Sequence, residues 1–238
     1  MTARTHRMEL IFLGVYVVMY AVGIAGHYLV ATIEVMLRLT PAILFLLGAS
    51  VFAPLVAARQ WRIIVWAVAT YLVTFMLEAI GVATGDVFGS YEYGPTLGLK
   101  LLDVPLVIGF NWVVVVLGAI TGVQLVAEKL MHRPGVSRQR RSVSVAVGTV
   151  LAAASVGLVA VGFDLLLEPV AIGLDYWHWA GVVVPLRNYV AWFLIATLVS
   201  FPVFLLRPRF ESRVPLYYLV VQTVFIAALN PLVGGGAA

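Results

Sequence analysis

Long apolar runs alternate with short polar breaks along the whole of this 238-residue chain. The runs lie at about 9–30, 39–57, 62–84, 104–127, 143–167, 186–206 and 214–233. A helix needs roughly 20 consecutive apolar residues to cross a bilayer, and each run is about that long. The pattern therefore predicts an all-α integral membrane bundle of about seven transmembrane helices. We expect a single membrane domain over residues 1–238, with the first run retained as a helix rather than cleaved as a signal peptide.

Lysine and arginine are distributed unevenly between the loops that seven spans would create. Twelve of the 15 lie in the N-terminal tail and in the second, fourth and sixth loops. The other three are Arg38, Lys100 and Arg187, in the alternate loops. Because basic residues collect on the cytoplasmic side of a membrane, this split places the N-terminus in the cytoplasm and the C-terminus outside. Most acidic residues lie toward the opposite side, which indicates a polar site at the outer end of the bundle.

The amino-acid composition excludes several classes of protein and of functional site. The chain is 63% apolar and only 11% charged, so a soluble domain is excluded. It has no cysteine, which rules out disulfides, iron–sulfur clusters and thiolate nucleophiles. The formal charge of +4 comes from loop residues that act as topology signals, so nucleic acid is not an expected partner.

Several functions are excluded because the residues they need are missing. Lys100 and Lys129, the only lysines, lie outside the predicted spans, so no Schiff-base lysine for retinal is available. The chain has no aspartate-rich magnesium motif, no glycine loop for a nucleotide, and only isolated histidines such as His27 and His178. We therefore predict no metal and no cofactor. What remains is acid–base chemistry on an apolar molecule.

Three acidic residues in or next to predicted spans are the first candidates for chemistry. Glu78 lies near the outer end of the third run, and an ionisable residue inside a span is a functional candidate because its burial is costly. Asp164 and Glu168 form an i, i+4 pair just before Pro169. The alternatives are a structural, hydrogen-bonded Glu78 and a solvated acidic pair beyond the membrane edge.

Aromatic residues gather at the same outer level of the predicted bundle. They are Tyr91, Tyr93, Trp112, Tyr176, Trp177, Trp179, Tyr189 and Trp192. An interfacial belt of Trp and Tyr would explain many of them. Alternatively, some line a pocket where their ring faces stabilise a carbocation. Arg187 has a structural explanation as well, since it could neutralise the outer acids.

Two blocks of sequence resemble a known family. The first reads Glu-Ala-Ile-Gly-Val-Ala-Thr-Gly-Asp-Val-Phe-Gly-Ser-Tyr-Glu-Tyr over 78–93, followed by Leu97-Gly98, Val104-Pro105-Leu106 and Asn111-Trp112. The second contains Phe163-Asp164, Glu168-Pro169, Trp177-His178-Trp179, Pro185-Leu186 and the stretch from Asn188 to Trp192. Together they resemble the CruF-type membrane carotenoid hydratases over about 78–192. The chain departs from that pattern at Glu168 and Ala191 and in a short segment between Trp179 and Pro185.

The resemblance implies an enzyme of carotenoid biosynthesis in the cytoplasmic membrane of a prokaryote. It would add water across the terminal C1,C2 double bond of an acyclic end group, through a tertiary carbocation and without a cofactor. Its substrate would be a carotenoid from the bilayer, such as γ-carotene, lycopene or a bacterioruberin precursor. The chain could also associate with other enzymes of that pathway.

Specific residues carry these expectations. Candidate proton donors are Glu78 and Asp164, followed by Asp86 and Asp103. Candidate substrate-binding residues are Tyr91, Tyr93, Asn111, Trp112, Trp177, Arg187, Asn188 and Trp192. Two other functions remain open: a carotenoid cyclase or isomerase, which would begin with the same protonation, and a non-catalytic carotenoid-binding or transport protein, which would not need buried acids.

Overall fold

The computed structural model describes residues 3–131, 141–181, 183–206 and 212–234. Within them, seven helices are long and apolar enough to cross a membrane, which confirms the predicted number of spans. The helices are α1 (Ala3–Tyr28), α2 (Ile33–Ser50), the short α3 (Ala53–Ala57), α4 (Trp61–Thr84), α5 (Leu106–Met131), α6 (Arg141–Gly173), α7 (Leu186–Leu206) and α8 (Val214–Gly234). The α2 and α3 segments together form one span.

Four helices, α1, α2, α5 and α6, extend beyond the predicted limits by more than two residues. The second run begins at Ile33 rather than 39, with Glu34 in the first turn of α2. The fifth helix does not end at 167 but continues through Pro169 to Gly173. Proline removes one backbone donor, yet packed membrane helices tolerate this loss because neighbouring groups satisfy the freed carbonyl.

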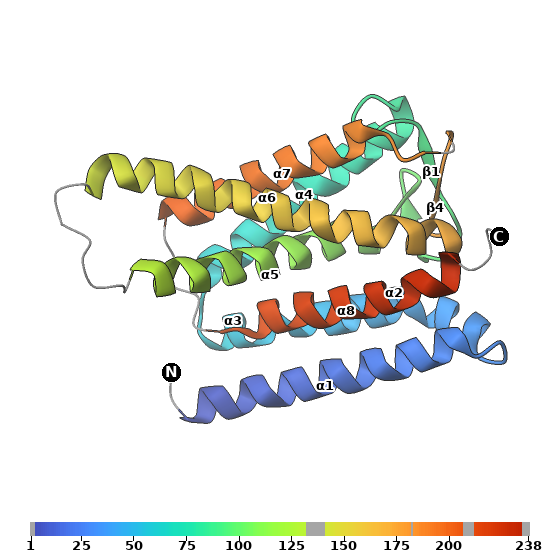
Figure 1. The fold of residues 1–238 in the computed structure, drawn as a ribbon, viewed down its shortest axis with the longest axis horizontal. Helices are drawn as coiled ribbons and strands as arrows, with labels where there is room; N and C mark the ends of the chain where they lie inside the picture. The colour runs from blue at the N-terminus through green and yellow to red at the C-terminus, as the bar shows by residue number, and fades with distance from the viewer. Residues whose placement is uncertain (1–2, 132–140, 182, 207–211, 235–238) are drawn as a thin grey trace.

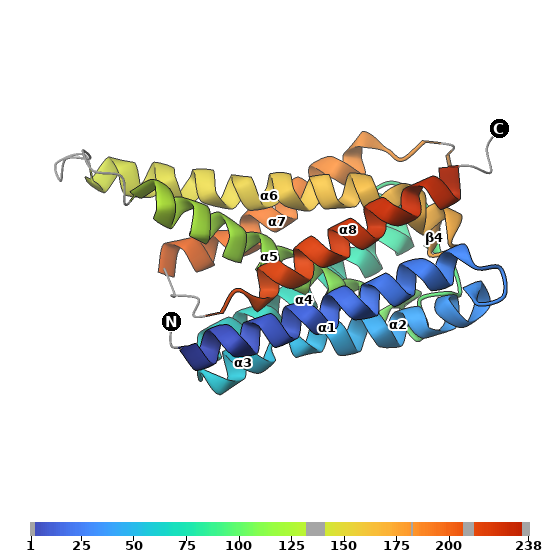
Figure 2. The same cartoon turned by 60° about the horizontal axis from the view of Figure 1, so that its bottom comes forward.

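The long helices run side by side along the long axis of the molecule, and α5 lies in the middle (Figures 1 and 2). It packs against α2, α4, α6 and α8, and its residues from Val113 to Leu117 are all buried. At Gly118 a Cβ atom would come within 2.7 Å of the Pro215 carbonyl oxygen and 2.6 Å of the Leu219 side chain. Glycine therefore allows α8 to approach α5 this closely.

Four short strands, which the all-helical prediction did not include, lie at one end of the bundle (Figure 1). They are β1 (Tyr91–Tyr93), β2 (Lys100–Leu101), β3 (Val104–Pro105) and β4 (Trp177–Trp179). The β1 strand pairs antiparallel with β4, and β2 pairs with β3. Gly85, with φ of 73°, ends α4 in a left-handed turn and starts the connection to β1.

The β1–β4 ladder joins two loops that are far apart in the sequence. Tyr91 is opposite Trp179, Glu92 is opposite His178, and Tyr93 is opposite Trp177. Because successive side chains of a strand point to opposite faces, the four aromatic residues share one face. Glu92 and His178 are exposed on the other face.

The helix α1 begins at one end of the bundle and α8 ends at the other (Figure 1). An odd number of spans requires this arrangement. Which end lies in the cytoplasm stays a prediction, because the fold alone carries no membrane orientation. Much of the basic loop at 129–141, together with Arg207 and Arg209, lies outside the described residues.

Candidate functional site

A polar pocket is enclosed where the β1–β4 ladder covers the ends of α4, α5, α6 and α7. Its lining residues are Glu78, Phe88, Tyr91, Tyr93, Ile108, Asn111, Trp112, Asp164, Leu167, Glu168, Trp177, Trp179, Asn188 and Trp192. The three carboxyl side chains and Asn188 are each no more than 3% exposed. The pocket therefore buries three acids among aromatic and aliphatic side chains and two asparagines.

Two tyrosines of β1 hold the Glu78 carboxyl. The hydroxyl of Tyr93 donates to Glu78 Oε2 at 2.7 Å, and the hydroxyl of Tyr91 donates to the same oxygen. Burial and the adjacent Glu78 carboxyl raise the pKa of both phenols well above the usual value, so both keep their protons. Glu78 Oε1 accepts no hydrogen bond from the described part of the chain.

Asn188 connects the two acids of α6. Its Nδ2 donates to Asp164 Oδ2 at 2.7 Å and to Glu168 Oε1 at 3.3 Å. Glu168 Oε2 also accepts from the indole nitrogens of Trp177 and Trp179, at 2.9 and 3.0 Å. Glu168 is therefore held on both oxygens, whereas Asp164 is held on one.

A stack of aromatic rings forms another wall. The rings of Trp112 and Trp192 are stacked with centroids 3.6 Å apart, and the rings of Phe88 and Trp192 are stacked with centroids 5.3 Å apart. Tyr91 packs on Trp179, and Tyr93 meets Trp177 edge to face. The aromatic side chains of β1 and β4 thus donate hydrogen bonds to the acids and also pack their rings against one another.

The space between these groups has a volume of about 30 Å³. A cavity of more than roughly 15 Å³ can hold a water molecule if polar partners surround it. Among the described residues, those that line this cavity include no Lys, Arg or His. The pocket is thus small and polar on its carboxyl side, and no cationic side chain of the described residues lines it.

The structure brings most of the predicted site residues together. Glu78, Asp164 and nine further lining residues were singled out or noted from the sequence as acids, aromatics or amides. Asn111 reaches this pocket from α5, and its Oδ1 accepts a hydrogen bond from Gln222 Nε2 at 2.7 Å. Tyr71 shares a helix with Glu78 but lines a different, apolar groove.

Three predicted site residues do not line the pocket. Asp86 and Asp103 are exposed at the surface, Asp103 in the β2–β3 turn with φ of 61°. Arg187 is exposed as well, and its Nη1 donates to the backbone carbonyl oxygens of Gly85 and Asp86 at 3.2 and 3.1 Å. It fastens the start of α7 to the turn after α4 and does not reach the three acids.

Five lining residues were not among the predicted site residues: Glu168, Trp179, Phe88, Ile108 and Leu167. The i, i+4 spacing of Asp164 and Glu168 was a signal for the first, because such residues share a helix face. The alternation in Trp177-His178-Trp179 was a signal for the second, because such residues share a strand face. Nothing in the local sequence distinguished Phe88 from an ordinary loop aromatic.

Among the described residues, no group of three or more acidic or histidine side chains is arranged to hold a metal ion. No curated protein and no solved structure matches the chain. A family model described as carotenoid biosynthesis protein does match, over residues 39–235, and this range contains every residue of the pocket. Since the match covers most of its length, the chain belongs to the carotenoid biosynthesis protein family.

Proposed function

We propose that this protein hydrates an acyclic carotenoid end group, adding water across its terminal C1,C2 double bond to give a tertiary alcohol. The observation that carries the proposal is the water-sized cavity bounded by three buried carboxyls and aromatic rings. Acid-catalysed hydration needs a proton donor, a place for a tertiary cation and one held water. Membership of a carotenoid biosynthesis family supplies the substrate class.

Glu78 is the proposed proton donor. Three negative charges would be poorly solvated in a buried pocket whose described lining residues include no cation, so we expect at least one acid to be protonated. Because Glu78 Oε2 already accepts two phenolic hydrogens, the acidic proton belongs on Oε1. No donor in the described part of the chain binds that oxygen, so its proton is free to go to C2 of the substrate.

Protonation at C2 leaves a tertiary cation at C1. The ring faces around the pocket can stabilise this cation, as aromatic faces do for other cations. The oxygen of the held water then forms a bond to C1, and the extra proton of the water passes to a carboxylate. Asp164 is suited to accept it, because Asn188 binds Oδ2 and leaves Oδ1 open. Return of that proton to Glu78 completes the cycle with no net redox change.

Glu168 has a different role in this scheme. Its oxygens accept three hydrogen bonds, two of them from indole N–H groups of β4. Such donors fix the position of the carboxyl group. Glu168 thus orients Asn188 and β4 rather than exchanging protons with substrate.

Expression in bacteria that make lycopene or γ-carotene tests the proposal. Pigment should accumulate that is heavier by one water for each modified end. Its polyene absorption should barely change, because the reacting double bond lies outside the conjugated system. A new ring at unchanged mass would favour a cyclase, and unchanged pigment with every substrate would favour a binding protein. Cells carrying Glu78→Gln serve as the matched control.

A further inference from the structure

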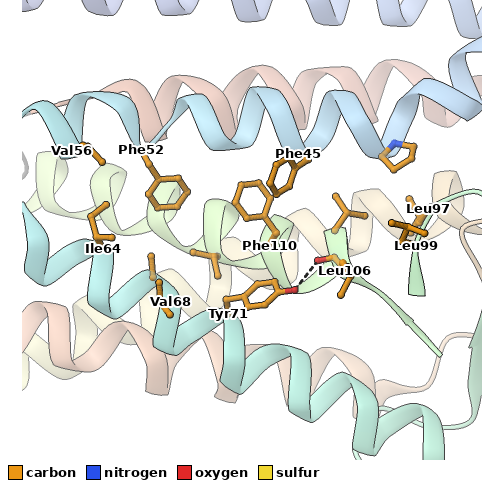
Figure 3. Close-up of a pocket in the computed structure, with 15 residues that line it drawn as sticks. Phe45, Phe52, Val56, Ile64, Val68, Tyr71, Leu97, Leu99, Leu106 and Phe110 are labelled. Atoms are coloured by element: carbon orange, nitrogen blue, oxygen red, sulfur yellow. Dashed lines mark hydrogen bonds between the residues drawn. The ribbon is translucent and has the colours of Figure 1, made fainter. Parts of the chain in front are cut away.

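A long apolar groove runs along the outside of the bundle between α2–α3 and α4, with α5 as its floor (Figure 3). Its volume is about 730 Å³, within the range of roughly 300–1,000 Å³ that small-molecule sites occupy. It extends from Pro41 to Val56 along one wall, which at 1.5 Å per helical residue is about 22 Å. A groove of this shape fits an extended chain better than a compact ligand.

The groove is lined almost entirely by hydrocarbon and opens sideways from the helices. Figure 3 shows Phe45, Phe52 and Phe110 along it, and the rings of Phe45 and Phe110 lie 4.9 Å apart. The side chains of Phe45 and Val68 are more than half exposed at its mouth. Since these helices are the predicted spans, the mouth faces the acyl chains of the bilayer.

One end of the groove approaches the acidic pocket through an intermediate cavity of about 50 Å³. Leu97 and Val107 line both the groove and this cavity. Asn111 and Trp177 line both this cavity and the acidic pocket. The three spaces therefore form a row, separated by single layers of side chains.

Leu97 is placed at the first of these partitions by the turn that follows it. Gly98 adopts a left-handed φ of 79°, close to the ring of Pro41 on α2. As a result Leu97 is 2% exposed, whereas Leu99 is 81% exposed. The side chain of Leu97 therefore lies between the groove and the intermediate cavity.

The acidic pocket by itself has room for water but not for a five-carbon end group, so substrate must reach it from elsewhere. We propose that the groove binds the conjugated chain of the carotenoid, taken up sideways from the bilayer, and that its end group passes Leu97 and Val107 to the acids. This inference rests on the proposed hydration. The occupant is one long isoprenoid chain, because the groove is apolar, elongated and continuous with the site of reaction.

The first experiment measures lycopene binding to the purified protein in detergent, in the Glu78→Gln background so that bound pigment is not converted. Val68→Trp fills the groove at its mouth and should weaken binding about tenfold, the size of loss expected from overfilling a packed site. Val65→Trp is the matched control, since Val65 is on the same helix, 68% exposed and outside the groove. Equal affinity of the two variants, or a groove that retains phospholipid and binds no lycopene, overturns the proposal.

The second experiment concerns passage of the end group. Leu97→Phe enlarges the partition and should slow conversion about tenfold in a single turnover at saturating lycopene, where any change in affinity does not enter the rate. Leu101→Phe, on the neighbouring β2 strand and outside all three spaces, should convert at the original rate. Conversion by Leu97→Phe at the original rate would show that substrate takes another route.

The two proposals fail in different ways. If the protein binds lycopene and Val68→Trp weakens binding, but no carotenoid gains water, the groove stands and the proposed hydration is wrong. If pigment gains water and Val68→Trp leaves both KM and lycopene affinity unchanged, the hydration stands and the groove is not the binding site.

Discussion

The carboxyl oxygens of the pocket are of two kinds. Some accept hydrogen bonds from protein groups, and the others accept none from the described residues. Glu78 Oε1 and Asp164 Oδ1 belong to the second kind, and both residues line the same cavity. Proton transfer requires an oxygen that can reach the substrate or the water. The roles proposed for the two acids follow from this difference in hydrogen bonding.

Replacing Glu78 with Gln removes the proposed acid but keeps an oxygen that can accept from Tyr91 and Tyr93. We expect normal folding and a turnover lower by about 10²–10⁴-fold, the usual contribution of a general acid. Glu78→Asp should retain partial activity. Product formation per milligram of purified membrane protein measures the effect, and Glu92→Gln at an exposed position is the control.

Full activity of Glu78→Gln, together with complete loss in Asp164→Asn, would transfer the donor role to Asp164. Loss in both variants agrees with a donor and a water-activating base. Loss of protein from the membrane in Glu78→Gln would instead assign Glu78 a structural role.

Asn188 gives a second prediction at this scale, because one amide nitrogen serves both Asp164 and Glu168. Asn188→Ala leaves two buried carboxyls without that donor, which should lower the free energy of unfolding by about 1–3 kcal/mol. Asn188→Asp adds a third carboxyl beside them and should destabilise more. Thermal unfolding in detergent measures both, and equal melting temperatures for Asn188→Ala and the unchanged protein would contradict the assigned bonding.

At the scale of secondary structure, the β1–β4 ladder positions the side chains that donate hydrogen bonds to two different acids. Tyr91 and Tyr93 bind Glu78 from one strand, while Trp177 and Trp179 bind Glu168 from the other. Backbone hydrogen bonds from Gly94 to Tyr176 and from Ala180 to Ser90 extend the ladder at both ends. This small sheet couples the geometry of α4 to that of α6.

Glu92→Pro tests this coupling, since proline removes a backbone donor from the middle of β1. We expect at least a tenfold loss of hydration with little change in the melting of the helices, because the bundle holds most of the buried apolar surface. Glu92→Ala changes only an exposed side chain and should stay within about twofold of the original activity. Full activity in Glu92→Pro would mean that the ladder does not position the site.

At the scale of the whole molecule, the orientation of the bundle decides from which side the acidic pocket is reached. Because the chain has no cysteine, single introduced cysteines label cleanly. With the N-terminus in the cytoplasm, a cysteine at Ala58 or at Ser137 should resist a membrane-impermeant reagent in intact cells. A cysteine at the exposed Ser90 should react. The opposite labelling pattern would reverse the orientation and place the pocket on the cytoplasmic side.

The sequence by itself determined the spans, because a stretch that lies in lipid must be apolar along its whole length whatever its neighbours are. For the same reason the sequence identified Glu78 and Asp164 as candidates. Each is an acidic residue within an apolar stretch, where burying an acid is energetically costly. The end of α6 was placed too early, because Pro169 is a strong local stop signal that membrane packing overrides.

Only the tertiary structure decided which of these residues meet. Tyr91 and Trp179 are 88 positions apart in the chain, and their pairing depends on the packing of α4 against α5 and α7. Asp86, Asp103 and Arg187 have the same local signals as pocket residues, yet they lie at the surface. The hydrophobic periodicity of a segment indicates which face of one helix or strand is buried. A site is made of contacts between elements, and long-range packing, which no local pattern encodes, sets those contacts.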